Sequence, residues 1–344
     1  MILRLRLRSF LLLPLLCGSL ISAQEIKQPV ESGTIQLDVV VTPKSGAPVA
    51  GLQEKDFTIL DNKVERPIIS FHAHDGSQEP IRVILLIDSV NTNFTTIAYE
   101  RTQLDKFLHA DGGHLSHPTT LAILTDKGVQ IQPGFTTDGN ATASSFDAQI
   151  IGLRTIPRST GFYGATERLD ISIKAMLQLA TYGRGQPGRK IILWVSPGWP
   201  LLSRTQGNLT DQQTKGIFDQ IVSISSLLRQ SRTTVYAINP LGTNERVINT
   251  FDYETFLKGV SKPHDSNIGN LGLQVIAEQS GGLVISSSDV EGLLEQSLAD
   301  TKSYYTLSFD AAPTEQKDAY HRIDVHVGQP GLTARTSTGY YTEP

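Results

Sequence analysis

The chain has 344 residues, 39% hydrophobic and 19% charged, which is enough for one or two domains with an apolar core. Its 30 basic and 34 acidic residues give a net charge of −4, and the basic residues form no patch with interleaved aromatics, so nucleic acid is not an expected partner. Cys17 is the only cysteine, which excludes an internal disulfide.

The first residues have the pattern of a secretory signal peptide. Three arginines precede an apolar stretch over 10–16, and small residues lead to a cleavage position after Ala23. The apolar stretch is shorter than the about 18 residues that a transmembrane helix needs. We therefore expect residues 1–23 to be removed. The mature protein would be exported, as a periplasmic, envelope-associated or secreted protein with no stable transmembrane anchor.

Residues 24–79 show the alternation of β-strands. In TIQLDVVVT (34–42) every second residue is apolar, which places one set of side chains on a single face. The members of that set are Ile35, Leu37, Val39 and Val41. The runs DFTILDN and PIISF follow after turn residues, so we expect a small antiparallel β segment.

Residues 80–302 alternate between strand and helix patterns. RVILLID, TTLAILTD, KIILWV and TTVYAIN are apolar runs typical of strands buried on both faces. Between them lie helical patterns over 96–109, 165–181 and 211–230, the first with Ile97, Arg101, Leu104 and Leu108 at helical spacing. A helix, a strand and a helix over 273–302 complete the series. The order predicts an α/β domain with a doubly wound, mostly parallel sheet.

Residues 303–344 return to strand patterns. The runs are YYTLSFDA, HRIDVHVG and LTARTSTGYY. We expect this C-terminal β segment to pair with the N-terminal one in a flanking antiparallel β-sandwich, into which the α/β domain is inserted.

In open α/β sheets, ligands bind beyond the carboxyl ends of the strands, where the strand order reverses. The polar residues at these positions are Asp88, Ser89, Asn91 and Thr92 after RVILLID, and Ser196 after KIILWV. An Asp at a strand end has two interpretations: a ligand of a hard cation, or a turn residue that accepts backbone hydrogen bonds.

Several segments together resemble the bacterial VWFA-related proteins known from acidobacteria, whose central domain is of the von Willebrand factor type A kind. They are "DVVVTPKSGAPVAGLQEKDFTILDNKVERPIISF", "LIDSVNT", "GATERLDISIKAM", "KIILWVSPG", "VIAEQSGG", "YYTLSFD" and "GYY". The resemblance covers nearly the whole mature chain. It implies an adhesion-type domain that binds proteins at the top of its sheet, assisted in many relatives by a divalent cation.

The cation motif of that family is incomplete here. Its pattern is Asp-x-Ser-x-Ser; Asp88 matches the aspartate, Val90 replaces the first serine, and Thr92 can replace the second. The resemblance implies Thr166 as a third ligand, and Mg²⁺ or Mn²⁺ as the ion. Proline follows Ser196 where the family has a further aspartate. One carboxylate is little charge for a divalent cation, so the residues favour a degenerate, vestigial metal site.

No catalytic constellation is visible. Ser196 lacks the Gly-x-Ser-x-Gly turn of a hydrolase. The eight histidines show no metal-ligand spacing, and we interpret them as exposed loop residues, among them His74 and the pair His114 and His117. We therefore expect a non-enzymatic protein-binding module. The alternatives are a structural component of a cell-envelope assembly with a vestigial metal site, and a hydrolase that uses the strand-end loops.

Overall fold

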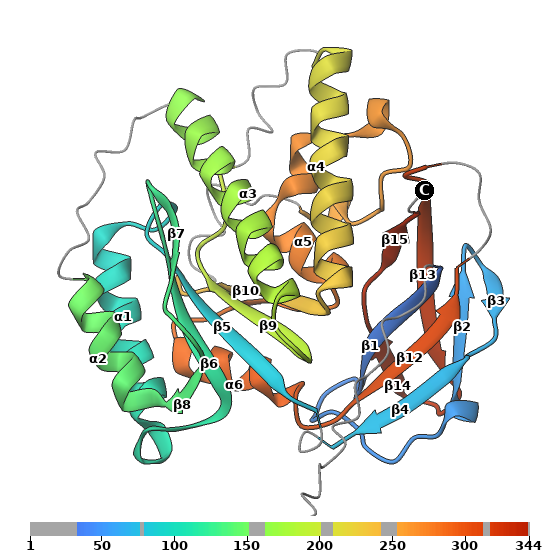
Figure 1. The fold of residues 1–344 in the computed structure, drawn as a ribbon, viewed down its shortest axis with the longest axis horizontal. Coiled ribbons are helices and arrows are strands. Elements are labelled where there is room, and N and C mark those ends of the chain that lie inside the picture. The colour runs from blue at the N-terminus through green and yellow to red at the C-terminus, as the bar shows by residue number, and fades with distance from the viewer. Residues whose placement is uncertain are drawn as a thin grey trace, which may run out of the picture. The chain divides into compact units, whose positions relative to one another are not determined.

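The structure is a computed structural model. It describes residues 33–75, 79–150, 162–200, 209–241, 253–311 and 317–342. The expected signal peptide lies outside these residues. From Gly33 onward the chain forms one compact unit (Figure 1).

The centre of this unit is a seven-stranded sheet. Its strands are β5 (Ile81–Asp88), β6 (His114–Thr125), β7 (Gly128–Ile131), β8 (Thr136–Asp138), β9 (Arg189–Val195), β10 (Thr233–Asn239) and β11 (Val284–Ser286). They are arranged in the order β11-β10-β9-β5-β6-β7, with β8 also paired to β6. All pairs are parallel except β6 with β7 and β6 with β8.

Helices cover both faces of this sheet (Figure 1). The helices are α1 (Phe94–His109), α2 (Gly139–Ile150), α3 (Phe162–Arg184), α4 (Asp211–Gln230), α5 (Leu273–Gln279) and α6 (Val290–Ala299). Buried side chains of α3, α4 and α5 form one apolar cluster with the sheet, and those of α1, α2 and α6 form a second on the opposite face. The result is the three-layer architecture that a strand-helix alternation predicts.

Local signals account for where these elements begin and turn. Asn93 caps α1 by accepting a hydrogen bond from the Thr96 N–H at 2.8 Å. Thr210 and Gln213 form a capping box at the start of α4. Gly128 takes a φ of +100° in the tight connection between β6 and β7, a conformation that costs glycine least.

Strands from both ends of the described chain form two further antiparallel sheets. They are β1 (Thr34–Pro43), β2 (Phe57–Asp61), β3 (Val64–Arg66), β4 (Ser70–His74), β12 (Tyr304–Asp310), β13 (Tyr320–Val327), β14 (Leu332–Arg335) and β15 (Gly339–Tyr341). The sheet orders are β14-β1-β12-β4 and β15-β13-β2-β3. The alternating side chains of β1 are at most 4% exposed and share a core with Phe57, Ile59 and Phe309.

The predicted fold class is confirmed: a doubly wound, mostly parallel sheet is flanked by antiparallel strands from both chain ends. The sequence patterns did not predict three elements, the edge strand β3, strand β8 and helix α2. One helix face was also assigned wrongly. Arg101 is exposed, and Glu100, one residue earlier, is the fully buried side chain between Ile97 and Leu104.

An ion-pair network joins the antiparallel strands to the α/β layers. Arg232, in the turn before β10, donates to Asp38 Oδ1 of β1 at 2.6 Å and to Glu79 Oε2 at 2.9 Å. The Tyr304 hydroxyl donates to the same Glu79 oxygen at 2.9 Å. Burial alone would lower the pKa of Arg232, but the two carboxylates outweigh it and raise that pKa above its ordinary value.

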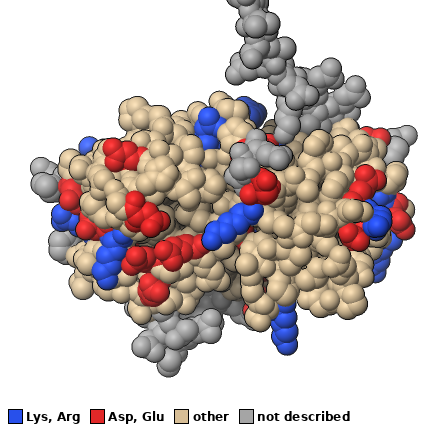
Figure 2. Space-filling model, turned by 90° about the horizontal axis from the view of Figure 1, so that it is seen from below, with Lys and Arg blue, Asp and Glu red and all other residues tan. Residues whose placement is uncertain are grey.

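Among the described residues, none of the helices combines the length and the apolar character that crossing a bilayer requires. On the face drawn in Figure 2, Lys and Arg side chains are interspersed with Asp and Glu.

Candidate functional site

The strand order reverses between β5 and β9. From β5 the chain moves outward through β6 to β7, and it then returns to β9 on the other side of β5 before continuing to β10 and β11. Asp88 is the last residue of β5, and Ser196 directly follows β9. Because Ile87 and Val195 are paired neighbours, the two predicted residues lie side by side at the position where doubly wound sheets bind ligands.

The Asp88 side chain is fully buried and accepts four hydrogen bonds. Its Oδ1 accepts from the backbone N–H groups of Val90 at 3.0 Å and Asn91 at 2.9 Å. Its Oδ2 accepts from Asn91 Nδ2 at 2.8 Å and from the Trp194 indole at 3.1 Å. The bond to Val90 is the Asx-turn arrangement. Asp88 therefore holds the turn after β5 and ties it to β9.

Burial dominates the electrostatics of Asp88. Desolvation raises its pKa, and the hydrogen bonds from Asn91 and Trp194, together with the nearby Ser196 hydroxyl, oppose that increase. Donors of this kind favour the charged carboxylate, whereas a dry environment disfavours it.

The other predicted strand-end residues are also engaged within the protein. The Ser89 hydroxyl donates to the Leu124 carbonyl at the end of β6 at 2.5 Å. Ser196 Oγ accepts from the Gly198 N–H at 3.1 Å and is 2% exposed. Thr92 is buried. These hydroxyls shape the loops, and little of their surface faces solvent.

Thr166 lies on a different turn of α3 from the residue that contacts the Asp88 turn. Helix α3 meets the Asp88 turn through Ser172, whose hydroxyl accepts from Asn91 Nδ2 at 2.9 Å. Thr166 precedes Ser172 by six residues, which is about 9 Å of helix rise and about 240° of rotation. Thr166 is exposed. The structure thus brings Asp88, Asn91 and Ser196 together and leaves Thr166 outside that group.

The residues do not fit a directly bound divalent cation in this arrangement. A carboxylate offers about four lone-pair directions, and four N–H donors already occupy those of Asp88. A cation would have to displace these donors, which would then be buried without acceptors. The described part of the chain also contains no group of three or more His, Cys, Asp or Glu side chains placed to hold a metal.

Sequence reasoning missed three residues of this site: Trp194, Ser172 and Glu100. A Trp inside a buried strand needs an acceptor for its indole N–H, and that need pointed to a carboxylate on the neighbouring strand. Ser172 is a polar residue within the buried stripe of α3. Glu100 is 0% exposed, and neither of its carboxyl oxygens has a hydrogen-bond partner.

Glu100 lies close enough to Asp88 for the two charges to interact. Burial, and then the negative charge of Asp88, raise the pKa of Glu100 well above its usual value. An ionised, unpaired carboxylate is costly in a dry interior, so Glu100 favours the neutral form.

We expect the stability of Glu100→Gln relative to the wild type to increase with pH. The pKa of Glu100 in the folded protein is raised. The stability that the protonated Glu100 side chain contributes is therefore fully present below the unfolded pKa of about 4.3, and it is lost as pH rises through the folded pKa. Gln does not titrate, so the variant keeps its stability over this range. Each unit of that elevation corresponds to about 1.4 kcal/mol. Urea unfolding from about pH 4 to about pH 8 measures the effect. Glu295→Gln, at an exposed position of α6, is the control; a pH-independent difference for Glu100→Gln would contradict the expectation.

The first turns of α3 extend past the strand ends. Ser172 contacts the Asp88 turn, and α3 begins ten residues earlier. At 1.5 Å of rise per residue, about 15 Å of helix therefore precedes Ser172. This part of α3 extends past the carboxyl ends of the strands (Figure 1). Tyr163, in the first turn, is 85% exposed. An exposed aromatic on a projecting edge is the type of residue that dominates protein interfaces.

The histidines correct an expectation from the sequence. His74 and His321 are buried, and both lie in strands of the flanking sheets. His321 Nδ1 is 2.7 Å from Asp61 Oδ1, and His74 Nε2 is 2.9 Å from the Thr306 hydroxyl. His114 and His117 lie in β6 and not in a loop. Strand alternation places the rings of His74 and His321 inside, where polar partners compensate for burial.

No protein-family model matches the chain, and no curated protein does. Among solved structures, the chain is similar to human COPII-coat protein Sec24c, with 10% identity, 77% of this chain and 44% of that chain covered, and a TM-score of 0.33. It is also similar to the pilus adhesin SpaC from Lactobacillus rhamnosus GG, with 10% identity, coverage of 86% and 43%, and a TM-score of 0.36.

A third similar structure is manganese-loaded Plasmodium vivax TRAP protein, with 11% identity, 78% of this chain and 97% of that chain covered, and a TM-score of 0.35. The chain spans less than half the length of Sec24c and SpaC. Because these likenesses have low identity and low TM-scores, the fold assignment depends on the strand order and connections described above.

Proposed function

We propose that this chain is an exported, non-enzymatic protein-binding module of the von Willebrand factor type A kind, whose ligand surface is the carboxyl edge of the parallel sheet. The observation that carries the proposal is the projecting end of α3, with Tyr163 85% exposed, beside the strand-end turns at the reversal of strand order. Such an edge offers an aromatic anchor and polar loops on a rigid scaffold.

Recognition at this edge is proposed to proceed without a metal ion. Asp88 serves as the internal acceptor that fixes the turn, so the loops keep their shape without a cation. Mg²⁺ or Mn²⁺ would bind only if the Asp88 donors rearranged. The non-enzymatic assignment is supported by Ser196, whose oxygen accepts from Gly198 N–H and is buried.

We expect Tyr163→Ser to weaken partner binding by about tenfold or more, because exposed aromatics at an interface contribute about 2 kcal/mol or more when truncated. Envelope proteins of the producing cell are crosslinked to the mature chain, and the identified partner is then titrated against each variant. Val64→Ser is the matched control, since Val64 is 56% exposed on β3 at a sheet edge of the sandwich.

Binding that resists EDTA and falls only in Tyr163→Ser supports the proposed surface. Binding that is lost in Val64→Ser and retained in Tyr163→Ser would place the surface on the sandwich instead. Loss on adding EDTA would show that a cation takes part.

A further inference from the structure

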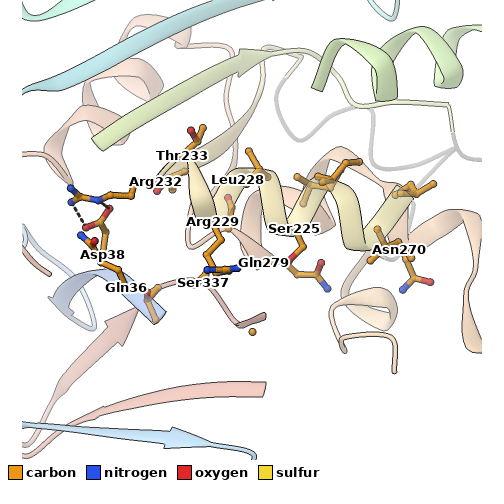
Figure 3. Close-up of a pocket in the computed structure, with 18 residues that line it drawn as sticks. Gln36, Asp38, Ser225, Leu228, Arg229, Arg232, Thr233, Asn270, Gln279 and Ser337 are labelled. Atoms are coloured by element: carbon orange, nitrogen blue, oxygen red, sulfur yellow. Dashed lines mark hydrogen bonds and ion pairs between the residues drawn. The ribbon is translucent and has the colours of Figure 1, made fainter. Parts of the chain in front are cut away.

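A pocket lies away from the strand-end surface, between α4, the C-terminal turn of α5, strand β1 and the segment before β15 (Figure 3). Its empty volume is about 690 Å³, counting the space that opens to solvent.

One wall of the pocket is aliphatic. It is formed by Ile221, Ile224 and Leu228 of α4 and by Ile276 of α5, all of which line the pocket. Their spacing along α4 places the first three on a single stripe. An aliphatic group that displaces water from this wall would bury apolar surface on both sides.

The other side of the pocket is polar and contains an unused hydrogen-bonding group. Ser225, Ser337 and Thr336 contribute hydroxyls to its lining. The Thr336 Oγ1 atom is buried and has no hydrogen-bond partner. A buried hydroxyl without a partner calls for an explanation, and a bound group that donates or accepts at this point supplies one.

The positive charges of the lining face negative groups of the protein itself. Arg232 lines the pocket and is paired with Asp38 (Figure 3) and with Glu79. Arg229, the second cation of the lining, and Gln279 belong to the last turns of α4 and α5, where both helices present the negative ends of their dipoles. Phosphates bind at the opposite, N-terminal ends of helices.

Ring stacking is also absent from the lining. None of the described residues that line the pocket is Phe, Tyr or Trp. Nucleobases are commonly held by stacking on such rings. The lining favours an aliphatic group flanked by neutral hydrogen-bonding groups, which is the chemistry of a Leu-like side chain on a peptide backbone.

We propose that this pocket binds an uncharged aliphatic residue of a partner polypeptide, with the side chain against the α4 stripe and the flanking amides at Thr336 and Ser225. It is a second contact site, separate from the strand-end surface and independent of the function proposed for that surface.

The test uses N-acetyl-leucine N-methylamide as the probe, titrated into the mature chain and followed by protein chemical shifts. A ligand of this size is expected to bind with Kd on the order of 1 mM. Ser225→Leu fills the pocket and is expected to weaken binding at least tenfold. Ser223→Leu lies on the exposed face of the same helix and is expected to bind like the wild type.

One further variant and one further probe test the role of the Thr336 hydroxyl and the preference for an uncharged ligand. Thr336→Val keeps the shape of the side chain and removes the hydroxyl, and it is expected to weaken the probe several-fold. N-acetyl-leucine, which carries a carboxylate, is expected to bind more weakly than the neutral amide. The proposal is overturned if the wild type shows no saturable shifts, if Ser225→Leu binds as well as the wild type, or if the carboxylate binds more tightly.

Discussion

Asp88→Ala is expected to lower the free energy of unfolding by about 3–5 kcal/mol, a range reached when several buried hydrogen-bond donors lose their acceptor together. The substitution removes the acceptor for Val90, Asn91 and the Trp194 indole. Because all of these groups are at the junction of β5 and β9, the turn after β5 would lose its internal support. Urea unfolding followed by far-UV circular dichroism measures the change, since Trp194 fluorescence reports on the altered site itself.

Two further variants sharpen this prediction. Asp88→Asn keeps one acceptor oxygen but places an NH₂ group against N–H donors, so we expect a loss between those of the wild type and Asp88→Ala. Asp105→Ala, on the exposed face of α1, serves as the control and is expected to change stability by less than about 0.5 kcal/mol. A loss below about 1 kcal/mol in Asp88→Ala would show that Asp88 is not the anchor of the turn.

Arg232→Met is expected to destabilise the protein by about 3–5 kcal/mol, as is typical when one partner of a buried ion pair is removed. Arg232, Asp38 and Glu79 have side chains only 17%, 9% and 7% exposed. Methionine retains much of the apolar contact of the side chain, so the loss reports the two carboxylates left without their counter-charge.

The control for Arg232→Met is Lys215→Met, which breaks the pair with Asp219 on α4. Both of those side chains are more than half exposed, at 66% and 55%, and such pairs contribute about 0–1 kcal/mol. Equal effects of the two variants in urea unfolding would contradict the role of Arg232 in joining the antiparallel strands to the α/β layers.

Periodicity in the sequence was enough to predict the architecture because most elements have an unmixed pattern. The alternation of β1 and the aliphatic stripe of α4 each place apolar groups on one face, and the structure buries those faces. Helix α2 was not predicted because GNATASSFDAQI contains few large apolar residues. Among the side chains of α2 that the structure describes, Ala143 and Phe146 belong to the buried apolar cluster. Arg101 rather than Glu100 was placed on the stripe of Ile97 and Leu104 because positions 100 and 101 both fit helical spacing from Ile97.

The sequence was enough to predict where the strand-end site lies, but not which side chains contact one another there. Strand ends identify Asp88 and Ser196 as neighbours once the strand order is known. The order itself, and the depth at which α3 crosses the Asp88 turn, are tertiary properties with no local signal. They determine that Ser172, and not Thr166, meets Asn91. A resemblance to a metal-binding family identifies residue types, but not whether N–H donors already occupy their oxygens.

The most direct test of a strand-end surface held by Asp88 rather than by a cation is calorimetric titration of Mg²⁺, Mn²⁺ and Ca²⁺ into the mature chain, with Thr92→Val and Asp88→Asn in parallel. We predict no saturable heat and no shift in melting temperature for any of the three ions, because Asp88 has no lone pair left for a metal. Saturable binding to the wild type that disappears in either variant would contradict this account and show a working metal site.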